Sequence, residues 1–323
     1  MCRLKKLFLA VDSGGSKTIW RVIDSEGNTV EVLRTDGMGS NPGILPVDEI
    51  TAGARDKLKN GDRIALIFLS LGGPNTEEVE SALKKSWSGA AVQVTREANG
   101  DAILKAAEHF SCRSAVLCGT GSTAVGIKGG QRRFSGGWGP LYGDFGSGGG
   151  IGKDALVMFL QSLDGEAKES GLSSLFSSLT EGVDVADFYG RMEVKRRAIG
   201  LKRKDLADLV PSLYDLYLAG NPDAVTLFRQ AAEAIARMAD DVTDDSPDAS
   251  VLLCGGLFAG KPDFLELCRA EFAKLSRAGM VYNPKIEPIA GACIGVLESA
   301  GVEVTQEIFD RILNGQETKG VQR

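Results

Sequence analysis

A short stretch near the N-terminus, DSGGSK at residues 12–17, places a carboxylate, two glycines and small polar residues directly after an apolar run. Glycines allow backbone N–H groups to approach an anion and to point at it. Asp12 cannot bind phosphate directly, but it can hold Mg²⁺ through water while the metal bridges phosphate oxygens. The stretch therefore has the residue types of a phosphate and Mg²⁺ site.

Two further glycine turns, at residues 119–121 and 255–256, also follow apolar runs. A single turn of this kind is typical of a tight hairpin, whereas three turns in the same strand–turn setting favour a phosphate cradle. Hydroxyl groups beside the glycines could add further donors. The candidate nucleotide-contacting residues are Asp12, Gly14, Gly15, Ser16, Lys17, Gly119, Thr120, Gly121, Ser122, Gly255 and Gly256.

Two familiar nucleotide motifs are excluded by their context. A Walker A loop would need glycine where Ser16 stands, and it would lead into a helix, whereas residues 18–23 read as a strand. The stretch GTGSTA at 119–124 fits a loose dinucleotide pattern, but a strand follows it and no acidic residue appears before Asp144. Neither motif predicts the function.

Two other carboxylates are candidates for chemistry. Asp101 is expected at the start of a helix, where it is either an N-cap or a general base that takes the proton of a substrate hydroxyl. Asp144 is a lone acid in a long glycine-rich loop, which favours a ligand-binding role. Phosphoryl transfer needs little beyond positioning, charge neutralisation and one such base.

The elements that position these residues are those of an α/β protein with an internal repeat. Residues 7–11, 18–23 and 29–35 predict an antiparallel meander, and alternating helices and strands follow up to residue 110. The plan then repeats from residue 114, so that the first two glycine turns occupy equivalent positions in two related halves. A mostly helical region reaches residue 245 and precedes the third turn.

Composition excludes several classes of protein. A chain of 323 residues predicts two domains, and a net charge of −6 argues against nucleic-acid binding. No apolar run approaches the length of a membrane span. The six cysteines form no CxxC pair, which indicates reduced thiols in a cytoplasmic protein. The basic segment 195–204 is interpreted as a solvated helical face.

Seven short motifs occur in order along the chain. They are DSGGSKT, SNP, LSLGG, GTGS, GGWG, GDFGS and LLCGGLF. Together they resemble the BadF/BadG/BcrA/BcrD-type ATPase family, and within it the N-acetylglucosamine kinase-like branch of the actin–hexokinase–Hsp70 superfamily. The resemblance implies two RNase H-like (actin-like ATPase) domains with an interdomain ATP/substrate cleft. The expected domains are 1–112 and 113–302, with a helix at 303–314 that packs back on the first and a loose tail at 315–323.

The resemblance also implies roles for individual residues. The first two glycine turns would bind the phosphates of ATP, with Mg²⁺ near Asp12, and the third turn would lie by the adenosine. Asp101 matches the catalytic base by its position before the GTGS turn. The implied sugar contacts are Asn41, Ser70, Gly72, Gly137, Trp138, Gly139 and Asp144.

This chain departs from the family pattern at several places. Phe145 stands where the kinase members usually carry an acidic residue, and the context of Asp101 is ANGDA, so that Glu97 is a reserve base. The leading hypothesis is an ATP-dependent kinase for an amino sugar, acting as a homodimer. The alternatives are an ATPase activator of a 2-hydroxyacyl-CoA dehydratase, which would need cluster-binding cysteines, and a non-catalytic sugar or nucleotide sensor.

Overall fold

Two five-stranded sheets with the same strand plan organise the chain. The computed structural model describes residues 6–14, 17–38, 46–72, 75–94, 98–164, 171–276 and 278–315, with the backbone alone at 94 and 98–101. The first sheet has the order β3-β2-β1-β4-β5 and the second β10-β9-β6-β7-β8. Read in reverse, the second order repeats the first, with three meander strands followed by two later strands. The predicted repeat is therefore confirmed.

The chain divides into two compact units. The first unit contains Met1–Ala115 and Asn283–Arg323, and the second contains Val116–Tyr282. The sequence placed residues 283–302 in the second domain, whereas the structure groups them with the first unit. The reason is that the helix in this segment packs on the first sheet and on a helix of the first unit.

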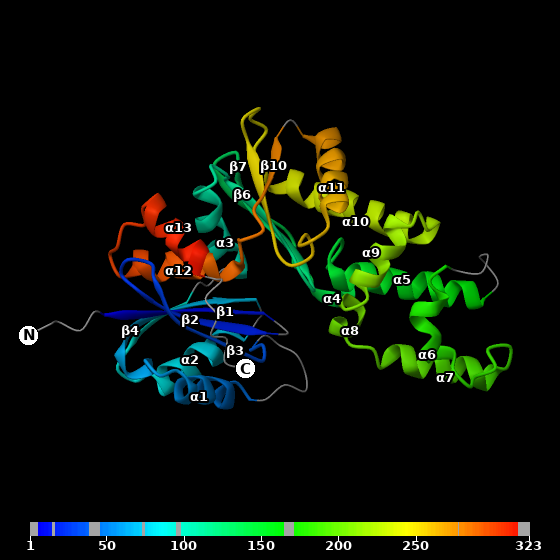
Figure 1. Cartoon of the computed structure of the whole chain (residues 1–323), viewed down its shortest axis with the longest axis horizontal. Helices are drawn as coiled ribbons and strands as arrows, with labels where there is room; N and C mark the ends of the chain where they lie inside the picture. The colour runs from blue at the N-terminus through cyan, green and yellow to red at the C-terminus, as the bar shows by residue number, and fades with distance from the viewer. Residues whose placement is uncertain are drawn as a thin grey trace, which may run out of the picture. The chain divides into compact units, whose positions relative to one another are not determined.

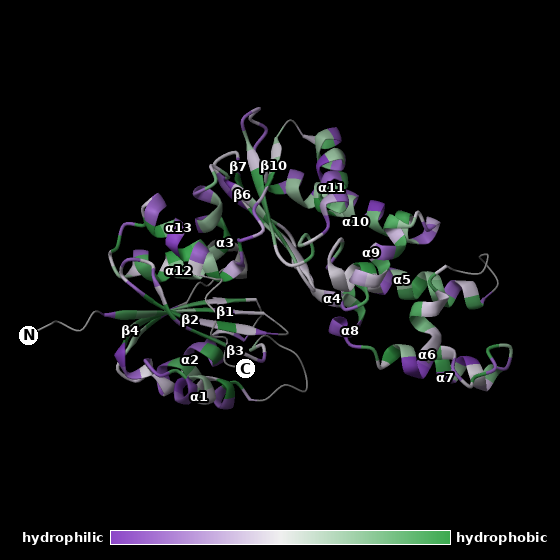
Figure 2. Cartoon of the chain, in the orientation of Figure 1, coloured by the Kyte–Doolittle hydropathy of each residue, from purple (hydrophilic) through white to green (hydrophobic). Residues whose placement is uncertain are grey.

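The first unit is built around a sheet with a buried centre. Its strands are β1 (Leu7–Ser13), β2 (Thr18–Asp24), β3 (Thr29–Thr35), β4 (Ile64–Leu71) and β5 (Ala91–Val94). The strands β1 and β2 pair antiparallel, and β1 and β4 pair parallel. Every residue of β1 is buried, as expected for a strand with helices on both faces. Figure 2 shows the hydrophobic residues along this sheet.

Helices cover both faces of the first sheet (Figure 1). One face carries α1 (Val47–Lys57) and α2 (Thr76–Ser86). The other carries α3 (Ala98–Glu108) and α12 (Pro288–Ser299), with α13 (Gln306–Asn314) packed on α12. A short 3₁₀ turn, η1 (Gly61–Arg63), leads into β4. The buried Arg21 donates to the carbonyl of Ile312 at 2.5 Å, which holds α13 on this unit.

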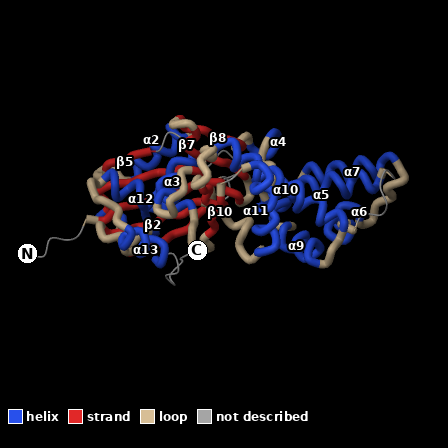
Figure 3. Tube along the Cα trace, turned by 90° about the horizontal axis from the view of Figure 1, so that it is seen from above, coloured by secondary structure: helices blue, strands red, loops and turns tan. Residues whose placement is uncertain are grey.

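The second unit adds a helical extension to its sheet. Its strands are β6 (Ser114–Cys118), β7 (Ser122–Lys128), β8 (Gln131–Gly136), β9 (Ser250–Cys254) and β10 (Gly279–Tyr282). Its helices are α4 (Gly139–Tyr142), α5 (Gly148–Leu163), η2 (Ser173–Phe176), α6 (Ser177–Thr180), α7 (Phe188–Ile199), α8 (Arg203–Ala207), α9 (Val210–Leu218), α10 (Pro222–Val242) and α11 (Pro262–Leu275). In Figure 3, α5, α6, α7 and α9 extend away from the strands of this unit.

Two observations bear on the class of protein. No helix in the described ranges is both long and apolar enough to cross a membrane. Five cysteines in the same ranges are buried and form no disulfide there: Cys112, Cys118, Cys254, Cys268 and Cys293.

Close contact between α3 and α12 depends on a glycine. A Cβ atom on Gly291 would overlap the carbonyl of Ala102, so the two helix backbones touch at this point. We expect Gly291→Ala to lower the stability of the first unit by about 1–3 kcal/mol, because the helices must separate to admit a methyl group. Calorimetric unfolding of the purified variant measures the loss.

A matched control is Gly53→Ala on α1, where an added Cβ meets nothing within 4 Å. This variant should be stabilised by about 0.5–1 kcal/mol, because alanine favours the helix. Equal melting temperatures for the two variants would contradict the close approach at Gly291.

Candidate functional site

Asp12 lies at the carboxyl end of β1, in the middle of the first sheet. Its partners in the sheet are Ile19 on β2 and Ser70 on β4. The Asp12 side chain is only 7% exposed, and its Oδ1 accepts a hydrogen bond of 3.2 Å from Ser70 Oγ. The parallel pairing of β1 and β4 thus brings together Asp12 and Ser70, which are far apart in the sequence.

Burial changes the acidity of Asp12. It raises the pKa of Asp12 from 3.8 to about 7, against the opposing effects of the Ser70 hydrogen bond and of Lys17, while Glu287 raises it further. A carboxyl group in this state ionises readily only when a cation compensates its charge. The described residues contain no cluster of three or more potential metal ligands. A single buried carboxyl group such as Asp12 fits Mg²⁺, which keeps several waters and is held by one or two carboxylates and by substrate phosphates.

The turn after β1 is tied to the end of β4. Gly14 N–H donates to the carbonyl of Lys17 at 3.0 Å, and Gly72 N–H donates to the carbonyl of Ser13 at 2.8 Å. The hydroxyl of Ser13 also accepts the N–H of Met38 at 2.9 Å. Three expected site residues of the first unit, Asp12, Ser70 and Gly72, therefore meet at one end of the sheet. Others fall outside the described residues: Gly15, Ser16 and Asn41.

Asp101 lies in the first turn of α3, three residues after the helix begins at Ala98. The alternative role of Asp101 as an N-cap is therefore wrong, because the helix starts before it. The side chain of Asp101 and the whole of Glu97 lie outside the described part of the chain. Helix α12 packs on both β1 and α3, the elements that carry Asp12 and Asp101.

The second glycine turn is clamped by the start of α5. Gly148 N–H donates to the carbonyl of Gly119 at 2.8 Å, and Gly149 N–H donates to the carbonyl of Thr120 at 3.0 Å. Ser147 caps α5 by accepting from Gly150 N–H, and its hydroxyl donates to the Thr120 carbonyl at 3.1 Å. The first N–H groups of α5 therefore hold the turn in place.

Asp144 points inward and its carboxylate is used within the second unit. It is 4% exposed, and its Oδ1 accepts the N–H of Ser122 at 3.3 Å. Its Oδ2 lies 2.5 Å from Nη2 of Arg203, which begins α8. Ser122 donates its hydroxyl to the carbonyl of Phe145 at 2.8 Å. Asp144 thus links three segments, and its predicted contact with a sugar stays a prediction.

The GGWG segment presents an aromatic side chain to solvent. Gly137 N–H donates to the carbonyl of Ser122 at 2.9 Å, which ties the segment to the second glycine turn. Gly137 and Gly139 have φ values of 75° and 81°, a backbone region that favours glycine. Trp138 between them is 76% exposed. Its ring is therefore available to stack on a ligand, as the sugar role requires.

The third glycine turn lies against the second. A Cβ atom on Gly255 would overlap the carbonyl of Cys118, and Leu257 N–H donates to the same carbonyl at 3.2 Å. Because Cys118 directly precedes Gly119, the turns at 119–121 and 255–256 meet at the ends of β6 and β9. The two turns must lie this close if both are to contact the same nucleotide.

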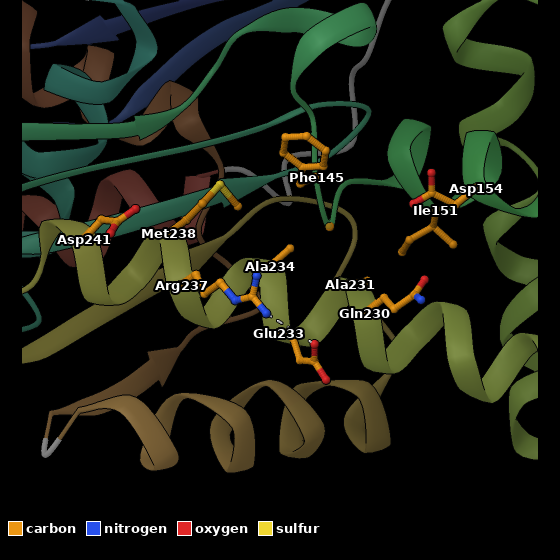
Figure 4. A pocket seen from close by; sticks show the side chains of 11 residues that line it. Phe145, Ile151, Asp154, Gln230, Ala231, Glu233, Ala234, Arg237, Met238 and Asp241 are labelled. Carbon is orange, nitrogen blue, oxygen red and sulfur yellow. Dashed lines mark ion pairs between the residues drawn. The ribbon is translucent and has the colours of Figure 1, made fainter.

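A cavity of about 410 Å³ lies beside Phe145 in the second unit (Figure 4). Its wall comes from α5 and α10, and it includes Arg237, whose guanidinium pairs with Glu233 at 3.6 Å. Burial raises the pKa of Asp154, another residue of the wall. Phe145 therefore borders a space of small-molecule size.

Two charged residues near the site were missed by sequence reasoning. The basic segment 195–204 was interpreted as a solvated helical face, which is wrong for Arg203, because it pairs with the buried Asp144. Glu287 lies close enough to Asp12 to raise its pKa. Both are distant in sequence from their partners, and no local pattern marks them.

Comparison with known sequences gives two matches. A profile of the BadF/BadG/BcrA/BcrD ATPase family matches residues 9–294. The N-acetyl-D-glucosamine kinase of Dictyostelium discoideum is 28% identical over 192 residues, which covers 53% of this chain and 59% of that protein. The chain thus aligns with little more than half of the length of this relative.

Solved structures share the fold over nearly the whole chain. A candidate N-acetylglucosamine kinase from Chromobacterium violaceum has a TM-score of 0.69 at 21% identity, covering 91% of this chain and 99% of that one. A ROK family glucokinase from Streptomyces griseus, in complex with glucose and AMPPNP, has a TM-score of 0.56 at 17% identity, covering 90% and 99%. The predicted α/β class with two RNase H-like, actin-like ATPase domains is confirmed.

Proposed function

Because the chain belongs to the BadF/BadG/BcrA/BcrD ATPase family, we propose that it is an ATP-dependent kinase that phosphorylates a hydroxyl of an amino sugar, such as N-acetylglucosamine or glucosamine. The observation that carries the proposal is Asp12. It is a buried carboxyl group with a pKa raised to about 7, at the strand end where the first glycine turn begins. Such a group is suited to a site that receives a cation together with phosphates.

Each candidate residue then has a role. Asp12 would hold Mg²⁺, which when bound would supply neutralisation of charge on the phosphates. That the glycine turns bind the phosphates of ATP stays a prediction. The sugar oxygen bonds to the γ-phosphorus as the bond to the leaving oxygen of ADP breaks. Asp101 accepts the proton of the sugar hydroxyl in this step.

The two alternatives are less well supported. An iron–sulfur activator needs cysteine thiolates that reach a cluster shared between subunits. Cys118 and Cys254 are 0% and 1% exposed, and burial raises the pKa of Cys118, so its thiolate is disfavoured. A sensor without catalysis would use the same fold, and only an assay for turnover separates it from a kinase.

Sugar-dependent ADP release tests the proposal. We expect the purified protein to release ADP from Mg-ATP only when one of N-acetylglucosamine, glucosamine, N-acetylmannosamine or glucose is present. The sugar that raises the rate identifies the substrate, and mass spectrometry of the product confirms the added phosphate. ADP release that is independent of sugar, or absent with every sugar, would reject the kinase.

Assembly and location are finer proposals. We propose a homodimer. We also propose a cytoplasmic location, which the buried thiols without disulfides in the described ranges support, since disulfides are rare in a reducing compartment. Sedimentation equilibrium at several protein concentrations tests the dimer, and a constant mass of one chain would reject it.

A further inference from the structure

Arg203 lies directly against the second glycine turn. A Cβ atom on Gly121 would overlap Nη2 of Arg203, so the guanidinium occupies the space that a side chain at Gly121 would fill. The Arg203 stem also passes within 3.2 Å of the place where a Cβ on Gly149 would stand. A single cation therefore lies between the turn at 119–121 and the start of α5.

The guanidinium is only partly satisfied by its present partner. Nη2 lies 2.5 Å from Asp144 Oδ2, yet Oδ2 has no aligned hydrogen bond, so the contact is a charge pair. The Nε of Arg203 is buried and has no hydrogen-bond partner in the described part of the chain. About a third of the side chain is exposed to solvent, 33%. Arg203 is thus held in orientation and retains donors for a further acceptor.

Several donors around this turn already have partners. The N–H groups of Gly148 and Gly149 hold the turn carbonyls, Ser122 N–H is bound by Asp144, and the Ser122 hydroxyl is bound by Phe145. A polyphosphate at this turn would be stabilised by a cation, and the guanidinium of Arg203 lies against the turn. Guanidinium groups bind phosphate oxygens through two parallel hydrogen bonds.

We propose that Arg203 binds a phosphate oxygen of the nucleotide at the second glycine turn, with Asp144 as the positioning residue for its guanidinium. The proposal rests on the proposed function only in that a nucleotide must bind. In this proposal Arg203 contacts the phosphates of the nucleotide, and it contacts neither the base nor the ribose. Neighbouring arginines differ, because Arg196 and Arg197 pair with Glu193 on α7.

Binding of ADP and of adenosine to the Arg203→Met variant tests the assignment. By titration calorimetry we expect the Kd for ADP to rise about 10- to 100-fold, as for the loss of a hydrogen bond to a charged group. The Kd for adenosine should stay within twofold of the wild type. Arg203→Lys should bind ADP with intermediate affinity, because lysine keeps the positive charge but cannot donate the two parallel hydrogen bonds of a guanidinium.

Lys204→Met is the matched control. Lys204 neighbours Arg203 in sequence, but its ammonium pairs with Asp208 on the surface of α8. This variant should bind ADP like the wild type. Arg203→Met should also show a weaker dependence of ADP binding on salt, which a loss of packing alone would not produce.

The outcomes separate this proposal from the kinase. Equal weakening of ADP and adenosine, or unchanged ADP binding, would assign Arg203 a structural role and overturn the inference. A wild-type protein that binds no ADP would also overturn it. Selective loss of ADP binding, in a protein that releases no ADP with any sugar, would support Arg203 and reject the kinase.

Discussion

Replacing Asp101 with asparagine is expected to lower kcat about 10²- to 10⁴-fold, the usual contribution of a general base. The residue lies within the first turn of α3 and is not its N-cap, and asparagine has nearly the same size as aspartate. The KM for ATP and the melting temperature should stay close to those of the wild type. Steady-state kinetics with the identified sugar, together with calorimetry, measures all three.

Two variants serve as controls for Asp101. Glu97→Gln tests the reserve base and should retain most of the activity. Glu108→Gln changes an exposed acid at the end of the same helix and should be neutral. If Glu97→Gln lost the activity and Asp101→Asn kept it, the base would be Glu97.

Replacing Asp12 with asparagine is expected to lower kcat/KM roughly 10²- to 10³-fold, as for the loss of one electrostatic contact to the reacting phosphates. Asparagine keeps an oxygen that can accept the hydrogen bond from Ser70, so the local geometry should remain. The lower kcat/KM should therefore come with a raised KM for Mg-ATP and with an activity that depends less strongly on the concentration of free Mg²⁺. Titration of activity against free Mg²⁺ measures it.

The same variant should change stability in a direction that depends on pH. The pKa of Asp12 is about 7 in the folded protein against 3.8 ordinarily, so the folded state holds a proton that the unfolded chain has lost. This group's contribution to the free energy of unfolding is full below pH 4 and is lost as the pH rises to 7. The shift of the Asp12 pKa from 3.8 to about 7 corresponds to about 4 kcal/mol in the free energy of unfolding.

Asp12→Asn has no such ionisation, so it should melt at a higher temperature than the wild type at pH 8 and at a similar temperature at pH 4. Thermal unfolding without nucleotide or Mg²⁺ at both pH values measures the difference. Ser70→Ala should raise the pKa of Asp12 further, because the Ser70 hydrogen bond lowers it. Identical pH profiles for Asp12→Asn and the wild type would contradict the buried, protonated state.

Periodicity and glycine spacing were sufficient to predict much of the fold. The meander strands predicted at 7–11, 18–23 and 29–35 became β1–β3 within two residues, because each strand has its own local apolar pattern. The equivalence of the turns at 14–17 and 119–121 was visible as a repeat, and the two sheets confirm it. These features are local, so the sequence carries them directly.

The segment 136–152 shows where local reasoning failed. The sequence predicts a long glycine-rich loop around Asp144, whereas α5 begins at Gly148 although glycine disfavours helices. Tertiary contact explains the glycines, since a Cβ on Gly149 would lie 2.6 Å from the carbonyl of Thr120. The helix forms because its first N–H groups bind the carbonyls of the turn at 119–121. This packing overrides the low helix propensity of glycine, and it depends on two segments that are distant in the sequence.

The sequence by itself determined the family, the α/β class, the three glycine turns and the carboxylate at the end of β1. Only the tertiary structure decided which charges meet: Asp12 with Ser70 and Glu287, and Asp144 with Arg203. These partners come from elements that are distant in the chain, and burial sets the strength of their interactions. Spacing along the sequence records neither the distance nor the burial, so the electrostatics of the site followed from the fold.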